Sequence, residues 1–178
     1  LDGDHASSFQ RRYQRVRVVA KSGGDYTSPL DAMNDVSSWC PSPTYDDPCL
    51  LRIMPGTYDI GANSLQMRES VHIEVSGMSS CTIQGALDSG TAGLVKGARL
   101  TELRHVRVLN TFFGVAGAAN AIAIYTDGNS WFYLDHVEAS AAYAGSASGI
   151  HQINSATTFM KSVRAWARGT NSSYGVYS

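Results

Sequence analysis

The amino-acid sequence predicts an all-β fold: a right-handed parallel β-helix with a short N-terminal capping helix and coils of about 26 residues. Three observations favour this fold. Apolar segments are only three to five residues long and are separated by Gly, Ser and Asn, which is typical of many short strands. The C-terminal half repeats at a fixed spacing. Long helical patterns are missing, which argues against a doubly wound α/β fold.

The repeat predicts how the coils stack. Residues 121–139 align with residues 147–165 without a gap, at an offset of 26, and residues 149–151 align in the same way with 175–177. One coil earlier, residues 103–108 align with 134–139 at an offset of 31, which a loop insertion explains. Three inward apolar columns follow: Ile124, Ile150 and Val176; Val106, Val137 and Val163; and Val108, Ala139 and Ala165. Each coil buries its apolar face only against its neighbours.

The same alignment places charges of alternating sign above one another on the outside of the coils. The two predicted columns are Arg104, Asp135 and Lys161, and Arg107, Glu138 and Arg164. Adjacent strands lie about 4.8 Å apart, so opposite charges at equivalent positions attract. Each exposed pair contributes only about 0.2–1 kcal/mol. We therefore read the columns as a register signal with a structural role.

The N-terminal half is predicted to close one end of this stack. We expect a polar leader over residues 1–15, a cap and first coils over 16–99, and regular repeats over 100–178 that continue beyond the chain end. A strand is expected over residues 16–20 and a helix from about Pro29 to Ser37. Ser28 is a suitable N-cap and Pro29 suits the first helical position. The helix would cover the otherwise open end of the sheets.

Two of the three cysteines bracket a short loop rich in proline and aspartate. A cross-link between Cys40 and Cys49 would stabilise a loop that has little packing of its own, so we predict a disulfide. The alternative is two buried thiols. Cys81 is then left over and is expected in the core, on a strand.

Composition excludes several classes of partner. The chain has 14 basic and 15 acidic residues and a net charge of −1, which gives no basic footprint for nucleic acid. No apolar run reaches the roughly 18 residues of a membrane-spanning helix, so no membrane insertion is expected. Charged residues make up only 16% of a chain rich in Gly, Ser, Ala and Tyr, which is typical of extracellular or cell-surface β-proteins. No cofactor is expected.

We find no complete catalytic set and no metal site in the sequence. A hydrolase would need two carboxylates on one groove. Asp127 lies in a turn sequence, Thr-Asp-Gly-Asn, and Asp135 already belongs to a charge column, so structural roles are favoured for both. His105 and His136 share a column whose third member is Ser162, which favours stacked surface histidines over metal ligands. Asp46 and Asp47 lie on the cysteine loop, away from any acidic cluster that could bind Ca²⁺.

One column of rings is a candidate ligand site. Tyr125, His151 and Tyr177 each follow an inward aliphatic residue and are therefore expected to point outward. An exposed row of rings can stack on sugar faces, which predicts a glycan-binding surface. The alternative is stacking between coils that stabilises the β-helix without a ligand.

Two segments resemble a known family. The sequences VVAKSGGDYTSPLDAM (18–33) and LLRIMPGTYDI (50–60) resemble the N-terminal region of pectinesterase-like members of the pectin lyase-like superfamily, and the later repeats resemble coils of its bacterial extracellular members. The resemblance implies a right-handed β-helix, secretion, and a role with carbohydrate or cell surfaces. The sequence also departs from the family, because Asp59 follows Tyr58 and Ala141-Ala142-Tyr143 replaces a Gln-Asp-Thr-like motif. The catalytic set of the family does not carry over.

Two functions remain. The first is an extracellular non-catalytic β-helix that acts as a surface, adhesive or fibre component and binds a polysaccharide or cell-surface glycan. The second is a carbohydrate-active enzyme, pectinesterase-like or a polysaccharide lyase, with its catalytic residues outside this segment. In either case, an uncapped C-terminal coil would favour self-association.

Overall fold

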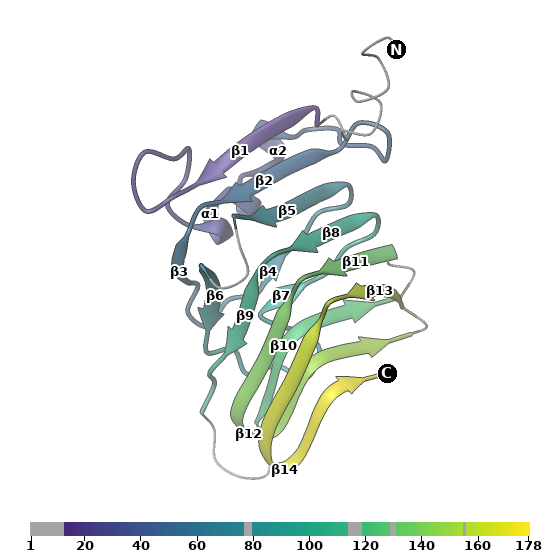
Figure 1. Cartoon of the computed structure of the whole chain (residues 1–178). Helices are drawn as coiled ribbons and strands as arrows, with labels where there is room; N and C mark the ends of the chain where they lie inside the picture. The colour runs from purple at the N-terminus through teal and green to yellow at the C-terminus, as the bar shows by residue number, and fades with distance from the viewer. Residues whose placement is uncertain (1–12, 77–79, 114–118, 129–130, 155) are drawn as a thin grey trace.

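The computed structural model describes residues 13–76, 80–113, 119–128, 131–154 and 156–178, with all their side chains except those at 143 and 144. The first twelve residues of the predicted leader lie outside this part of the chain. The chain forms a parallel β-helix of about four turns with about 26 residues per turn, as predicted (Figure 1). No helix among the described residues has the length and apolar character needed to cross a membrane.

A six-stranded sheet forms the first face of the β-helix, and all its strand pairs are parallel. In spatial order its strands are β1 (Arg15–Val19), β2 (Cys49–Ile53), β5 (Val71–Val75), β8 (Thr101–Arg104), β11 (Trp131–Asp135) and β13 (Thr157–Lys161). Neighbours in this sheet are strands of successive coils, which is the arrangement a stacked repeat requires.

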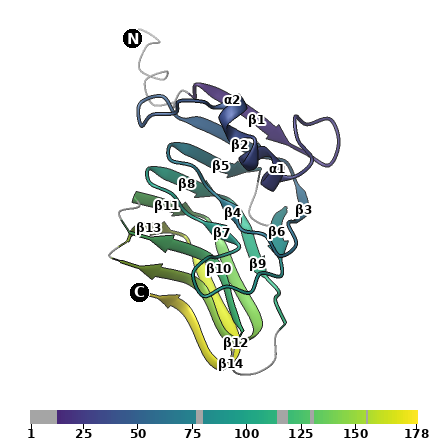
Figure 2. The same cartoon turned by 180° about the vertical axis from the view of Figure 1, so that it is seen from behind.

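An eight-stranded sheet forms the other two faces, because its last two strands are long enough to turn the corner between them (Figure 2). The second face contains β3 (Gly56–Asp59), β6 (Cys81–Gly85), β9 (Arg107–Asn110) and the first parts of β12 (Glu138–Ile153) and β14 (Arg164–Tyr177). The third face contains β4 (Leu65–Gln66), β7 (Val95–Lys96), β10 (Asn120–Asp127) and the remainder of β12 and β14.

The register matches the sequence alignment. Ile124 pairs with Ile150, and Ile150 pairs with Val176, so the column at an offset of 26 is confirmed. Leu103 pairs with Leu134, which confirms the offset of 31 one coil earlier. The repeats are therefore consecutive coils.

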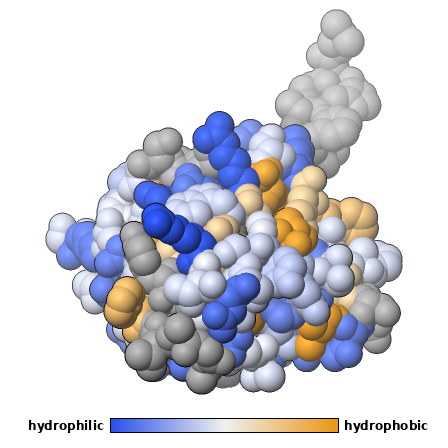
Figure 3. All heavy atoms as spheres, turned by 90° about the horizontal axis from the view of Figure 1, so that it is seen from below, coloured by the Kyte–Doolittle hydropathy of each residue, from blue (hydrophilic) through white to orange (hydrophobic). Residues whose placement is uncertain are grey.

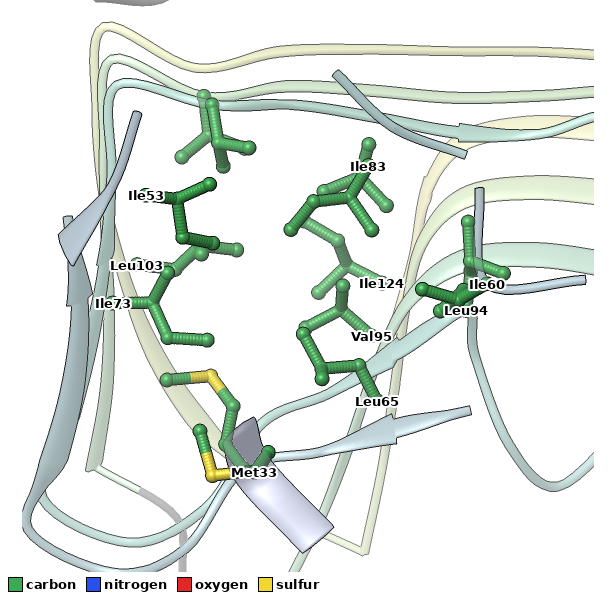
Figure 4. Packing of buried hydrophobic residues seen from close by; sticks show 14 of the residues in the cluster. Met33, Ile53, Ile60, Leu65, Ile73, Ile83, Leu94, Val95, Leu103 and Ile124 are labelled. Carbon is green, nitrogen blue, oxygen red and sulfur yellow. The ribbon is translucent and has the colours of Figure 1, made fainter. Parts of the chain in front are cut away.

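Apolar side chains from the faces meet in one interior. Figure 4 shows Ile73 and Leu103 of the first sheet opposite Val95 and Ile124 of the third face. All four are buried. The last coil differs, because β14 pairs with β12 alone within the described residues, and Val176 is left 48% exposed. Seen from this end, apolar residues form separate patches among hydrophilic ones (Figure 3).

The N-terminal cap consists of two short helices, in place of the single predicted one. Helix α1 (Pro29–Asn34) begins at Ser28, whose hydroxyl accepts a hydrogen bond from the Leu30 N–H at 3.2 Å. Asp35 leaves the helical conformation, and α2 (Val36–Trp39) follows it. The Trp39 indole donates to the Ala32 carbonyl at 2.8 Å and holds the two helices together. Met33 of α1 packs at the end of the apolar interior (Figure 4).

The structure contains the Cys40–Cys49 disulfide, which joins the end of the cap to the start of β2. Cys81 is the free thiol, and it is buried on β6 as expected. Burial raises the pKa of this thiol to about 12, so it is protonated at neutral pH.

Two matched substitutions test whether stacking provides the core. Val108→Ala removes two methyl groups from a fully buried site between coils and should lower the free energy of unfolding by about 2 kcal/mol. The same change at Val176, in the last coil, should cost less than about 1 kcal/mol. Urea denaturation followed by circular dichroism measures both. Equal losses at the two sites would contradict the stacked core.

Candidate functional site

A pocket of about 280 Å³ opens on the outer surface of the third face. It spans three successive coils, since its residues come from β10, β12 and β14 together with Gly90 of the preceding loop. Its lining is Gly90, Asn120, Ile122, Ser146, Ser148, His151, Ser172, Tyr174 and Tyr177. We refer to it below as the third-face pocket.

The predicted column of rings forms along this face. The ring centroids of Tyr125 and His151 are 5.7 Å apart, and those of His151 and Tyr177 are 4.6 Å apart, both in edge-to-face geometry. Tyr174, which the sequence interpretation missed, lies 4.9 Å from Tyr177. Tyr174 is in register with Ser148, so the repeat contained no aromatic signal at its position.

Tyr125 lies in the predicted column of rings but is covered, so it does not add to the exposed surface. The residue is only 2% exposed. Gly93 of the preceding coil lies so close that a side chain there would collide with Tyr125. Lys96, in register with Tyr125, places its ammonium 5.6 Å from the ring centroid. The ring is therefore covered from one side by the preceding coil and from the other by His151.

The solvent-facing rings are Tyr174 and Tyr177, each 43% exposed, while His151 is partly buried between rings. Burial holds the pKa of His151 below its usual 6.5, so its imidazole is neutral at neutral pH. A neutral imidazole has one N–H donor and one nitrogen acceptor, which suits it to pair with a hydroxyl group.

Polar groups line the other side of the third-face pocket. Asn120, Ser146 and Ser172 occupy one column of successive coils, and the Ser172 hydroxyl donates to the Ser146 hydroxyl at 2.9 Å. The pocket thus has rings along one column and hydroxyl and amide groups along another. Such a surface can stack on an apolar ring face and exchange hydrogen bonds with hydroxyl substituents.

The predicted charge columns lie in register, and two of the predicted pairs are within ion-pair distance across neighbouring coils. Arg107 contacts Glu138 at 3.2 Å, and Lys161 lies 3.8 Å from Asp135. Arg104 is opposite Asp135 in the sheet but its ion pairs run to Glu74 at 3.2 Å and Glu102 at 3.4 Å. Arg164 is in register with Glu138.

The two candidate aspartates end successive strands. Asp127 ends β10 and accepts a hydrogen bond from the Asn154 amide of the next coil at 2.7 Å. Asp135 ends β11, and one of its carboxylate oxygens lies 2.8 Å from Nδ1 of His136. Ala141 and Ala142, where the pectinesterase-like motif would fall, are buried. Asp46 and Asp47 are exposed on the cysteine loop.

His105 and His136 lie side by side at the corner between the first and second faces. Their ring centroids are 5.3 Å apart. Together with Asp135, which the sequence interpretation did not include, they place three potential ligand atoms within 4.8 Å of one another. This cluster is the group of described residues best suited to hold a metal ion.

Solved pectin methylesterases have the same architecture. Pectin methylesterase PemA from Erwinia chrysanthemi superposes with a TM-score of 0.59 at 15% identity, over 84% of this chain and 54% of that one. A pectin methylesterase in complex with hexasaccharide VII superposes with a TM-score of 0.59 at 17% identity, over 80% of this chain and 53% of that one.

The chain has the pectin lyase-like β-helix fold. The resemblance noted in the sequence is thus confirmed for the fold. The chain spans about half the length of the pectin methylesterases that it matches. No protein-family model matches the sequence, and no curated protein matches it.

The environment of His151 can be tested by NMR titration of its ring. Its pKa should be below 6.5, and Tyr177→Ala should raise it toward 6.5 by uncovering the ring. Because the unfolded chain takes up this proton first, the free energy of unfolding should fall as the pH decreases from 6.5 toward the lower pKa of the folded state. A His151 pKa at or above 6.5 in the unsubstituted chain would contradict this description.

Proposed function

We propose that the chain binds an extended polysaccharide in the third-face pocket and acts as a non-catalytic surface, adhesive or fibre component. The observation that supports this most is the pairing of two exposed tyrosines, Tyr174 and Tyr177, with a column of hydroxyl and amide groups on the same face. Both features lie on the outside of the coils, where a ligand can reach them.

The chemistry of a sugar ring matches this surface. One side of a pyranose ring presents C–H groups, which pack on an aromatic ring, and its rim presents hydroxyls, which need hydrogen-bond partners. Tyr174 and Tyr177 supply the rings. Asn120, Ser146 and Ser172 supply the partners, at intervals set by the coil spacing. A polymer lying across successive coils would meet similar groups repeatedly.

The solved relatives of this fold support the choice of ligand. One of the superposed pectin methylesterases was solved in complex with hexasaccharide VII, and a mutant enzyme was solved in complex with hexasaccharide IV. An oligosaccharide of that length is therefore a suitable first probe for this chain.

The disulfide supports an extracellular or cell-surface location. A Cys40–Cys49 bond persists in oxidising compartments and is rare in reducing ones. Association through the last coil, where apolar residues are partly exposed, stays a prediction.

The alternative function is a carbohydrate-active enzyme whose catalytic residues lie outside this segment. This alternative stays open because the chain matches only about half of each pectin methylesterase. Release of methanol from methyl-esterified pectin by the full-length protein, or formation of unsaturated products, would establish this alternative and exclude the non-catalytic role.

Calorimetric titration with pectin-derived hexasaccharides tests the binding proposal. Tyr174→Ala and Tyr177→Ala should each weaken binding by up to about tenfold, the value of one aromatic contact of about 0.5–1.5 kcal/mol. Tyr45→Ala is the matched control, because Tyr45 is 63% exposed but lies on the cysteine loop. Binding that is unchanged in both third-face variants would exclude this face, and a glycan array without any binding would exclude the glycan role.

A further inference from the structure

We propose that His105, Asp135 and His136 bind a divalent transition-metal ion such as Zn²⁺ at the corner between the first and second faces. The proposal is independent of polysaccharide binding, because this corner is separate from the third-face pocket.

Backbone geometry holds the two histidines in place. They directly follow β8 and β11 and have φ angles of 59° and 54°, in the left-handed region. The His105 N–H donates to the Asp135 carbonyl at 3.0 Å, and the His136 N–H donates to the Lys161 carbonyl at 2.9 Å. The backbone of each histidine is therefore tied to the next coil, which brings the two imidazoles side by side.

Asp135 supplies the third ligand. One of its carboxylate oxygens lies 2.8 Å from Nδ1 of His136. Ligand atoms on one Zn²⁺ ion lie about 2.1 Å from it, and so at most about 4.2 Å from one another. The three atoms here lie within 4.8 Å, so small rotations of partly exposed side chains would complete the site. The ion would then replace the contact between Asp135 and His136.

The donor set selects the class of ion. Two imidazole nitrogens and one carboxylate oxygen suit Zn²⁺, Ni²⁺ or Cu²⁺, whereas Ca²⁺ and Mg²⁺ require mostly oxygen ligands. A hollow of about 350 Å³, lined by Glu74, Val75, Ser76 and His105, lies beside the cluster and has room for water on the remaining coordination positions. Three protein ligands plus water is the arrangement of an open metal site.

Neighbouring charged side chains affect the affinity of the cluster for the metal ion. Lys161 lies 3.8 Å from the same Asp135 oxygen and competes with an ion for it, although its side chain is largely exposed and free to move away. Arg104 is held by Glu74 and Glu102, and these carboxylates offset its charge. Lys161→Ala should therefore strengthen binding of the ion.

The coil that follows His136 offers a test by gain of metal binding. Ser162 occupies the position equivalent to His136 and has a φ of 53°, a backbone conformation that the two histidines already adopt. Ser162→His would add a third imidazole to the column without a new backbone demand. A gain of affinity in this variant is not explained by loss of folding.

The experiment is calorimetric titration of the tag-free chain with ZnCl₂ alone. The unsubstituted chain should bind one ion at the cluster. His105→Asn and His136→Asn should each weaken that binding by about tenfold or more, and Ser162→His should strengthen it by a similar factor. Asparagine is chosen because it tolerates positive φ angles. Glu69→Gln, which removes an exposed carboxylate elsewhere, is the control and should leave binding unchanged.

Two results would overturn the proposal. One is no binding of Zn²⁺ by the unsubstituted chain at millimolar concentration. The other is binding that is the same in both asparagine variants and in Ser162→His, since the ion would then lie elsewhere. Thermal unfolding of each variant shows whether an asparagine substitution lost binding only because the chain unfolded, and in that event the Ser162→His result decides.

Discussion

The stacking of one coil on the next is the constraint on which the other features depend. A single coil has no interior, and Ile124, Ile150 and Val95 are buried only because their strands pair in a fixed register. A slip of one residue would turn these side chains outward and bring their polar neighbours inward. The same register aligns the rings of the third face, the charges on the first and second faces and the histidines at the corner. Core and surface are therefore set by one arrangement.

Left-handed corner residues reinforce that register. His105, His136 and Ser162 share one corner and one φ region, and Gly128 and Asn154 share another. At the second corner the Asn154 amide donates to Asp127 of the coil before it. A corner fixes the backbone but accepts different side chains, since both histidine and serine occur at the first. Such positions lie outside the core, so they are places where a binding group can stand.

Periodicity explains which features could be predicted from sequence. The columns through Ile124 and Val108, the offsets of 26 and 31, and the cysteine pairing follow from residues that repeat or bracket a loop. The burial of Tyr125 could not be predicted in this way. Gly93 and Lys96 lie against Tyr125, and they belong to a coil with no visible repeat. The position of the Asp135 carboxylate beside two imidazoles depends on side-chain rotation. The spacing of residues in the sequence does not predict such a rotation. The break at Asp35 in the cap likewise carries no periodic signal.

The third face is also the basis on which we propose binding in preference to catalysis. Successive coils place like positions above one another, so a catalytic pair would need two acidic positions close together on one face. The outward columns through Asn120, Ile122 and Tyr125 contain amide, hydroxyl, aliphatic, aromatic and ammonium groups in the described coils. Two carboxylates lie beside this face: Asp88 accepts a hydrogen bond from the Asn120 N–H, and Asp127 accepts one from the Asn154 amide. A surface of rings and hydroxyls can hold a sugar chain as it is, whereas hydrolysis would require a pair of acidic groups that face the bound sugar.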